Sequence, residues 1–129
     1  RPEDINPMLG EREQAVLAGL AERCEALPET RPEDAAASAT WYAGKRAFVR
    51  GRHDEGRLKL MFLVGPGQQA LMSDDPRYGQ PPYYGPSGWV ELDVQDRIHW
   101  DEIEGLLLTA YRQVALKRML RVLDDEPRS

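Results

Sequence analysis

The spacing of hydrophobic residues predicts a helix near the start of the chain and a connecting loop after it. Beyond Glu11 the apolar positions recur every three or four residues, which is typical of one face of a helix: Leu17, Leu20, Cys24 and Leu27. Pro28 ends this pattern. Residues 28–39 contain two prolines, several acids and small residues, and we predict that they form a connecting loop.

The next pattern predicts a β-hairpin. Residues 40–52 are rich in aromatic and β-branched positions, and residues 58–64 form a second extended run. Between these runs, Asp54, Glu55 and Gly56 are typical turn residues.

Four segments with distinct patterns follow the hairpin. Residues 68–72 have the character of a short helix, which Pro76 stops, and residues 77–88 are dense in Gly, Pro and Tyr. We predict that residues 77–88 form an ordered loop or an irregular edge strand, because no regular element tolerates so many prolines. Residues 89–94 alternate apolar and acidic positions after the Trp, as a half-buried strand does, and residues 100–123 carry the apolar stripe of a long amphipathic helix.

The order of these elements, α-β-β-α-β-α, predicts the fold class α+β. We expect two layers, in which an antiparallel β-sheet packs against the N-terminal and C-terminal helices. The length of 129 residues predicts one domain, so the chain divides into a lead-in at residues 1–10, a single domain at residues 11–123 and a polar tail at residues 124–129.

Composition narrows the class of protein. The chain is 41% hydrophobic and 30% charged, which is ordinary for a globular domain. Because Cys24 is the single cysteine, the chain cannot form an internal disulfide, which fits a reducing compartment. We predict that Cys24 packs as a small buried hydrophobic side chain. The apolar runs are too short to span a bilayer, and no basic-then-apolar leader opens the sequence, so we expect a cytoplasmic protein that does not enter the membrane.

Catalytic and metal-binding patterns are weak. The serines stand in no nucleophile-elbow motif, and Gly65-Pro66-Gly67 lacks the spacing and the lysine of a phosphate-binding loop. The two histidines, His53 and His99, lie 46 positions apart and neither belongs to a spaced ligand pair. We therefore predict no enzyme activity, no catalytic residues, no metal site and no cofactor.

Charge is unevenly distributed along the chain. The net charge is −5, but residues 44–59 carry six basic residues against two acidic ones, which makes this segment +4 and leaves −9 for the remainder. Basic side chains on a protruding hairpin can neutralise backbone phosphates and release counterions. The candidate nucleic-acid contacts are Lys45, Arg46, Arg50, Arg52, Arg57 and Lys59.

The faces of the first hairpin strand decide how these residues are presented. Regular pairing would place Arg46, Phe48, Arg50 and Arg52 on one face and Ala47 and Val49 on the other. Arginines beside an exposed Phe would suit stacking and phosphate contact together. The alternative is a solvated outer face with Phe48 buried, where the charges discourage aggregation.

Several short motifs together resemble the MmcQ/YjbR family. They occur in the order Leu27-Pro28-Glu29-Thr30, Gly44-Lys45 with Phe48, Pro66-Gly67 with Ala70-Leu71 and Asp74-Asp75-Pro76, Pro82-Tyr83-Tyr84-Gly85 with Gly88-Trp89-Val90, Trp100-Asp101-Glu102-Ile103 and Ala110-Tyr111-Arg112. The resemblance implies a CyaY-like two-layer fold and a proposed double-wing DNA-binding role, with no catalytic residues. One spacing departs from the family: Lys45 and Phe48 are one residue further apart than is common, and a bulge there would change the faces of that strand.

The sequence therefore predicts a binding module. The favoured hypothesis is weak, salt-dependent DNA binding through the basic hairpin. The alternative is a domain that binds a protein or a small molecule with its aromatic loop at residues 78–89, through Tyr78, Tyr83, Tyr84 and Trp89. Those rings can equally supply core area to an irregular loop, and for Trp89 we predict a place in the core.

Overall fold

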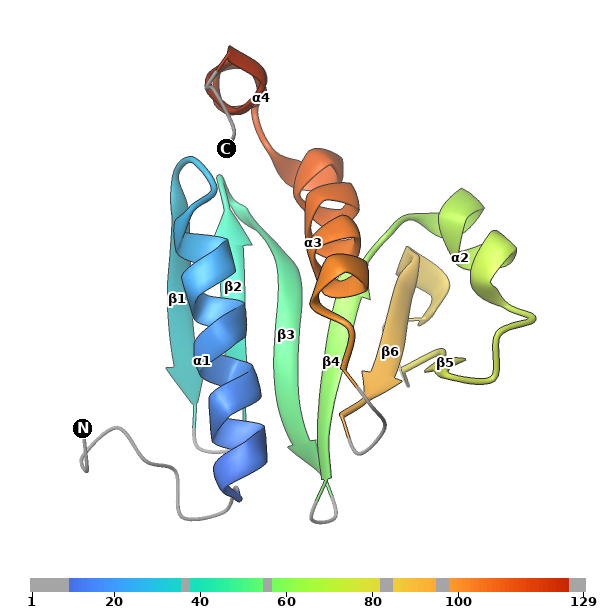
Figure 1. Cartoon of the computed structure of the whole chain (residues 1–129). Helices are drawn as coiled ribbons and strands as arrows, with labels where there is room; N and C mark the ends of the chain where they lie inside the picture. Colours follow the sequence, from blue (N-terminus) through green and yellow to red (C-terminus); the bar gives the residue numbers. More distant parts are fainter. Residues whose placement is uncertain (1–9, 36–37, 55–56, 82–84, 95–97, 126–129) are drawn as a thin grey trace.

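The fold is an antiparallel sheet with helices packed against it (Figure 1). The computed structural model describes residues 10–35, 38–54, 57–81, 85–94 and 98–125. Six strands pair in the order β1-β2-β3-β4-β6-β5. Their bounds are β1 Thr30–Ala35, β2 Ser38–Ala43, β3 Arg46–Asp54, β4 Arg57–Leu63, β5 Tyr78–Gly79 and β6 Trp89–Asp93. The predicted α+β class and antiparallel sheet are confirmed.

The longer helices α1 (Glu11–Glu25) and α3 (Trp100–Val114) lie on the same face of the sheet (Figure 1). Close packing of α1 depends on Gly51 of β3, where a Cβ atom would lie 2.7 Å from Leu17 Cδ2. On α3, the ring of Tyr111 meets that of Phe48 edge-on with a centroid distance of 5.7 Å. The opposite face of the sheet is called the open face below.

Smaller helices complete the chain. They are α2 (Pro66–Met72), a 3-10 turn at Gly85–Ser87 and α4 (Lys117–Asp125). The predictions of the first helix, the β3–β4 hairpin, the short middle helix and the strand beginning at Trp89 are confirmed. The expected irregular edge strand is the two-residue β5, which pairs with β6.

The connecting loop predicted at residues 28–39 is wrong, because this segment forms β1 and the beginning of β2. β1 is an edge strand whose residues Arg31, Pro32, Glu33 and Asp34 are all exposed. Such a strand buries no side-chain row and shows no apolar alternation, and charges and proline protect its free edge. The sequence of β1 therefore lacks the alternation of apolar and polar residues from which a strand is predicted.

The single extended run predicted at residues 40–52 is also wrong, because it is divided between β2 and β3. The chain reverses at Gly44-Lys45, and Gly44 has a φ of 61°, a left-handed conformation that glycine adopts without strain. Lys45 has none of the usual turn chemistry, so a two-residue turn was not expected here.

A bulge changes the faces of β3. Trp41 pairs with Val49 but Tyr42 pairs with Ala47, so Phe48 is an extra residue between them. Phe48 is fully buried against α3. The prediction that Phe48 shares a face with Arg46, Arg50 and Arg52 is wrong, and the alternative, a buried Phe48, is confirmed.

The long helix predicted at residues 100–123 is interrupted. Ala115 has an extended backbone (φ −65°, ψ 142°), and α4 starts in a new direction. The N–H of Leu116 donates to Met119 Sδ at 3.4 Å, which helps to satisfy the new helix start. Met119 and Leu123 are both buried, so the second half of the apolar stripe still reaches the core.

Among the helices that the structure describes, none has the length and apolar character needed to cross a membrane.

Candidate functional site

Four of the six candidate cations share the open face of the β3–β4 hairpin. Arg52 is paired with Lys59 across the strands, and Arg50 and Arg57 each stand two positions from one of these along their own strand. Side chains two apart, or directly opposite, lie on the same face of a sheet. Gly51, which faces α1, is paired with Leu60, so the intervening positions point toward the helices and the four cations point away.

Two acidic residues of β6 lie beside these cations. Glu91 accepts a bond from Arg52 at 3.1 Å and lies 3.7 Å from the Lys59 ammonium. Asp93 pairs with Arg57 at 3.0 Å. Only 13% of the Glu91 side chain is exposed, so its charge is partly withdrawn from water and held between the two cations. A phosphate approaching this face therefore competes with carboxylates that are already in place.

The remaining two candidates, Lys45 and Arg46, lie elsewhere. Both are exposed and stand at the opposite end of β3 from Asp54. A strand of nine residues places these ends about 26 Å apart. The structure thus divides the predicted basic site into an open-face group and a turn group.

The aromatic residues of the alternative site are largely internal where they are described. Trp89 is 7% exposed and belongs to the core, as predicted. Tyr78 is partly buried against the core, and burial together with its contact with Glu102 raises its pKa. Tyr83 and Tyr84 lie outside the described residues. With two of its rings engaged in packing, the aromatic loop offers less free surface than the sequence suggested.

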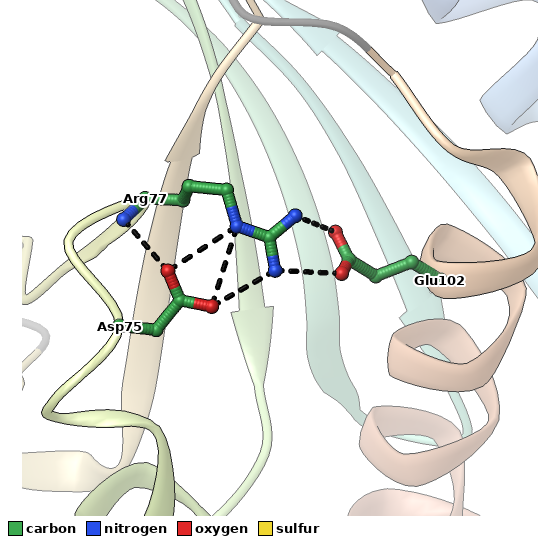
Figure 2. A network of polar contacts seen from close by, with 3 residues as sticks. All are labelled: Asp75, Arg77 and Glu102. Atoms are coloured by element: carbon green, nitrogen blue, oxygen red, sulfur yellow. Dashed lines mark hydrogen bonds and ion pairs between the residues drawn. The ribbon is translucent and has the colours of Figure 1, made fainter.

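Sequence reasoning missed a network that joins the loop after α2 to α3 (Figure 2). The Arg77 guanidinium donates to Asp75 at 2.8 Å and to Glu102 at 2.9 and 3.2 Å. The hydrogen bonds from Arg77 to Asp75 lower the pKa of the Asp75 carboxyl. Because two carboxylates surround the guanidinium, the network is a clamp between segments and not an anion site. The only signal was the Asp74-Asp75-Pro76 motif, which indicated the end of a helix.

A second missed network fastens the turn after α1. The Tyr111 hydroxyl donates to the carbonyl of Pro28 at 2.6 Å, and burial raises its pKa to about 12. Arg118 of α4 holds Glu29 through two hydrogen bonds of 2.7 and 2.9 Å, which lower the pKa of that carboxyl. The two contacts bring the turn, α3 and α4 to one end of the molecule.

Groups with catalytic or metal-binding potential are dispersed. Cys24 is fully buried, and burial raises the pKa of its thiol to about 12, so it is neutral and packs as a small apolar side chain. His99 is exposed directly before α3, whereas His53 lies within β3. Over the described ranges, no group of three or more His, Cys, Asp and Glu side chains is placed to hold a metal ion.

With this geometry in place, comparisons with known proteins give the family. The sequence pattern of the YjbR family matches residues 25–113. The chain belongs to the YjbR family. The matched segment runs from the end of α1 through the whole sheet and nearly to the end of α3, so that α4 lies outside it. Among curated proteins, none is significantly similar to this chain.

A solved structure supports the fold of this YjbR chain. It is the crystal structure of Deinococcus radiodurans protein DR2400, described as a DUF419 domain. The TM-score is 0.66 at 16% identity, over 84% of this chain and 87% of the other. At that identity the likeness establishes a shared architecture, and function has to be argued from this chain's own surface.

Proposed function

We propose that this YjbR chain is a non-catalytic module that binds a nucleic-acid backbone through the open face of its β3–β4 hairpin. The observation that carries the proposal is the common orientation of Arg50, Arg52, Arg57 and Lys59, which all point away from α1 and α3. A row of cations on one sheet face can contact successive phosphates without reading bases. We place this function in the cytoplasm, which the single, buried cysteine supports.

The surrounding charges set the expected strength. Glu91 and Asp93 neutralise part of the hairpin, and the whole chain carries −5, which repels a polyanion. Binding should therefore be weak, in the micromolar range or weaker at physiological salt, and nearly independent of base sequence.

Titrations of duplex and single-stranded DNA at two salt concentrations test the proposal. The variant Arg50→Ala/Arg52→Ala/Arg57→Ala should bind more weakly to every sequence. Its salt slope should fall by about one for each phosphate contact that is lost. A folded triple variant that binds like the wild type would contradict the hairpin site, and no wild-type binding at low salt would contradict nucleic-acid binding as such.

A further inference from the structure

Among the residues that the structure describes, the cations that lack a protein partner are gathered at one end of the molecule. Within the described part of the chain, four Lys and Arg side chains make no hydrogen bond or ion pair: Lys45, Arg46, Lys117 and Arg121. All four are exposed. Two belong to the β2–β3 turn and its first strand residue, and two belong to α4, about seventy positions later.

Packing brings these two segments together. A Cβ atom on Gly44 would lie 3.6 Å from Leu116 Cγ, so the β2–β3 turn touches the residue directly before α4. Lys45 directly follows Gly44, and Lys117 directly follows Leu116, so the two lysines flank this contact. Arg121 lies one helical turn beyond Lys117, where side chains four apart are neighbours. In Figure 1, α4 lies at the same end of the molecule as the turns that follow α1 and β2.

The charge balance of this end is positive. Residues 26–31, 44–46 and 112–125 contain seven basic and three acidic residues, which gives +4 in a chain whose total is −5. Two of the acids are already engaged, since Glu29 is held by Arg118 and Asp124 by Arg112. Like charges at Lys117 and Arg121 repel each other unless an anion lies between them.

We propose that this basic end, formed by Lys45, Arg46, Lys117 and Arg121, is a second surface that contacts the phosphate backbone of duplex DNA. The segments that form it contain no aromatic residue, so they offer no platform on which unpaired bases could stack. A duplex presents phosphates at high density without needing such a platform. The inference rests on the proposed nucleic-acid function, but it uses residues at the other end of β3 from the hairpin tip.

Two double variants test the basic end in the whole chain. They are Lys45→Gln/Arg46→Gln and Lys117→Gln/Arg121→Gln, each of which removes two positive charges. Ala15→Glu/Ala18→Glu on α1 is the matched control, because both alanines are exposed and the net charge changes equally. The probe is a short fluorescent DNA duplex, titrated at several salt concentrations.

Each end variant should lower the slope of log K against log salt by about 0.9 per lost contact, which weakens binding roughly eightfold per contact at 0.1 M salt. The control should leave the slope unchanged. Neither end variant should unfold at a lower temperature than the wild type, since the four cations make no hydrogen bond or ion pair that the substitutions could remove. End variants that bind as the control does would overturn the inference.

The same titrations separate this surface from the hairpin. If the triple hairpin variant loses affinity and the end variants do not, the proposed function stands and the basic end is refuted. If only the end variants lose affinity, the basic end stands and the hairpin site is refuted. Polyglutamate or phosphatidylserine vesicles that bind as tightly as the duplex, with the same losses, would overturn duplex DNA as the partner.

Discussion

The carboxylate of Glu91 controls how much positive charge the hairpin presents, and its neutralisation gives the sharpest prediction. In Glu91→Gln the side chain keeps its size but loses the charge that holds Arg52 at 3.1 Å and Lys59 at 3.7 Å. Each of these cations then loses one carboxylate that competes with phosphate. We expect this variant to bind DNA more tightly than the wild type.

The gain in DNA affinity depends on how many new phosphate contacts Arg52 and Lys59 make. Each new phosphate contact adds about 0.9 to the salt slope, or roughly eightfold in affinity at 0.1 M salt, so two contacts set the upper limit near sixtyfold. Stability should decrease in the same variant. Glu91 is 13% exposed, and Arg52 and Lys59 are about one quarter exposed, so the loss lies between surface and buried pairs, about 1–2 kcal/mol.

Fluorescence anisotropy of a labelled duplex measures the gain, and urea unfolding measures the loss. Glu22→Gln is the matched control, since it changes the net charge equally from an exposed position on α1, on the other side of the sheet. A gain of equal size in both variants would mean that only total charge matters. An affinity that does not rise in Glu91→Gln would refute the idea that this carboxylate competes with phosphate.

Three further predictions concern stability. Trp89→Ala should cost about 3–5 kcal/mol in urea unfolding, as large aromatic truncations in cores do, and near wild-type stability would make Trp89 a binding residue instead. Gly88→Ala should cost at least about 1–3 kcal/mol, because Gly88 has a φ of 93° and a Cβ atom would lie 2.7 Å from neighbouring backbone atoms. The control Gly67→Ala, which has open space around it, should leave the free energy of unfolding unchanged. Arg77→Gln should destabilise at neutral pH, and the difference from the wild type should shrink in acid. The reason is that Arg77 depresses the Asp75 pKa below its ordinary 3.8, so this stabilisation is present above that pH and lost below it.

The fold was predictable where one face of an element is buried. In α1 the buried positions Val16, Leu20 and Cys24 follow the helical spacing, and in β6 the apolar residues alternate with Glu91 and Asp93. β1 was missed because an edge strand buries no row of side chains. The break at Ala115 was missed because the apolar stripe continues across it, and nothing in the local sequence requires α4 to turn.

The bulge at Phe48 shows the limit of period-two reasoning. A strict alternation placed Phe48 with the arginines, but one extra residue opposite Trp41 and Tyr42 moves Phe48 into the core beside Tyr111. The unusual spacing between Lys45 and Phe48 was the only signal. This spacing indicated that β3 could contain a bulge, but it did not indicate that Phe48 is the bulged residue.

Charge was the property that the linear sequence represented least well, because pairing in the sheet redistributes it. A window over residues 44–59 shows +4, yet the order β3-β4-β6 places Glu91 and Asp93 next to that window from more than thirty positions away. The alternation of acids on β6 complements that of bases on β4, and opposite charges on adjacent strands stabilise the pairing. Conversely, the long helix predicted over residues 100–123 would place Lys117 and Arg121 near a helix C-terminus, where cations are favourable. Lys117 is instead the first residue of a separate helix, at the end where the macrodipole disfavours cations, and it directly follows the residue that the β2–β3 turn contacts, whereas Arg121 stands at the centre of that helix. A basic group in that position is better explained by an external anion than by the stability of its own helix.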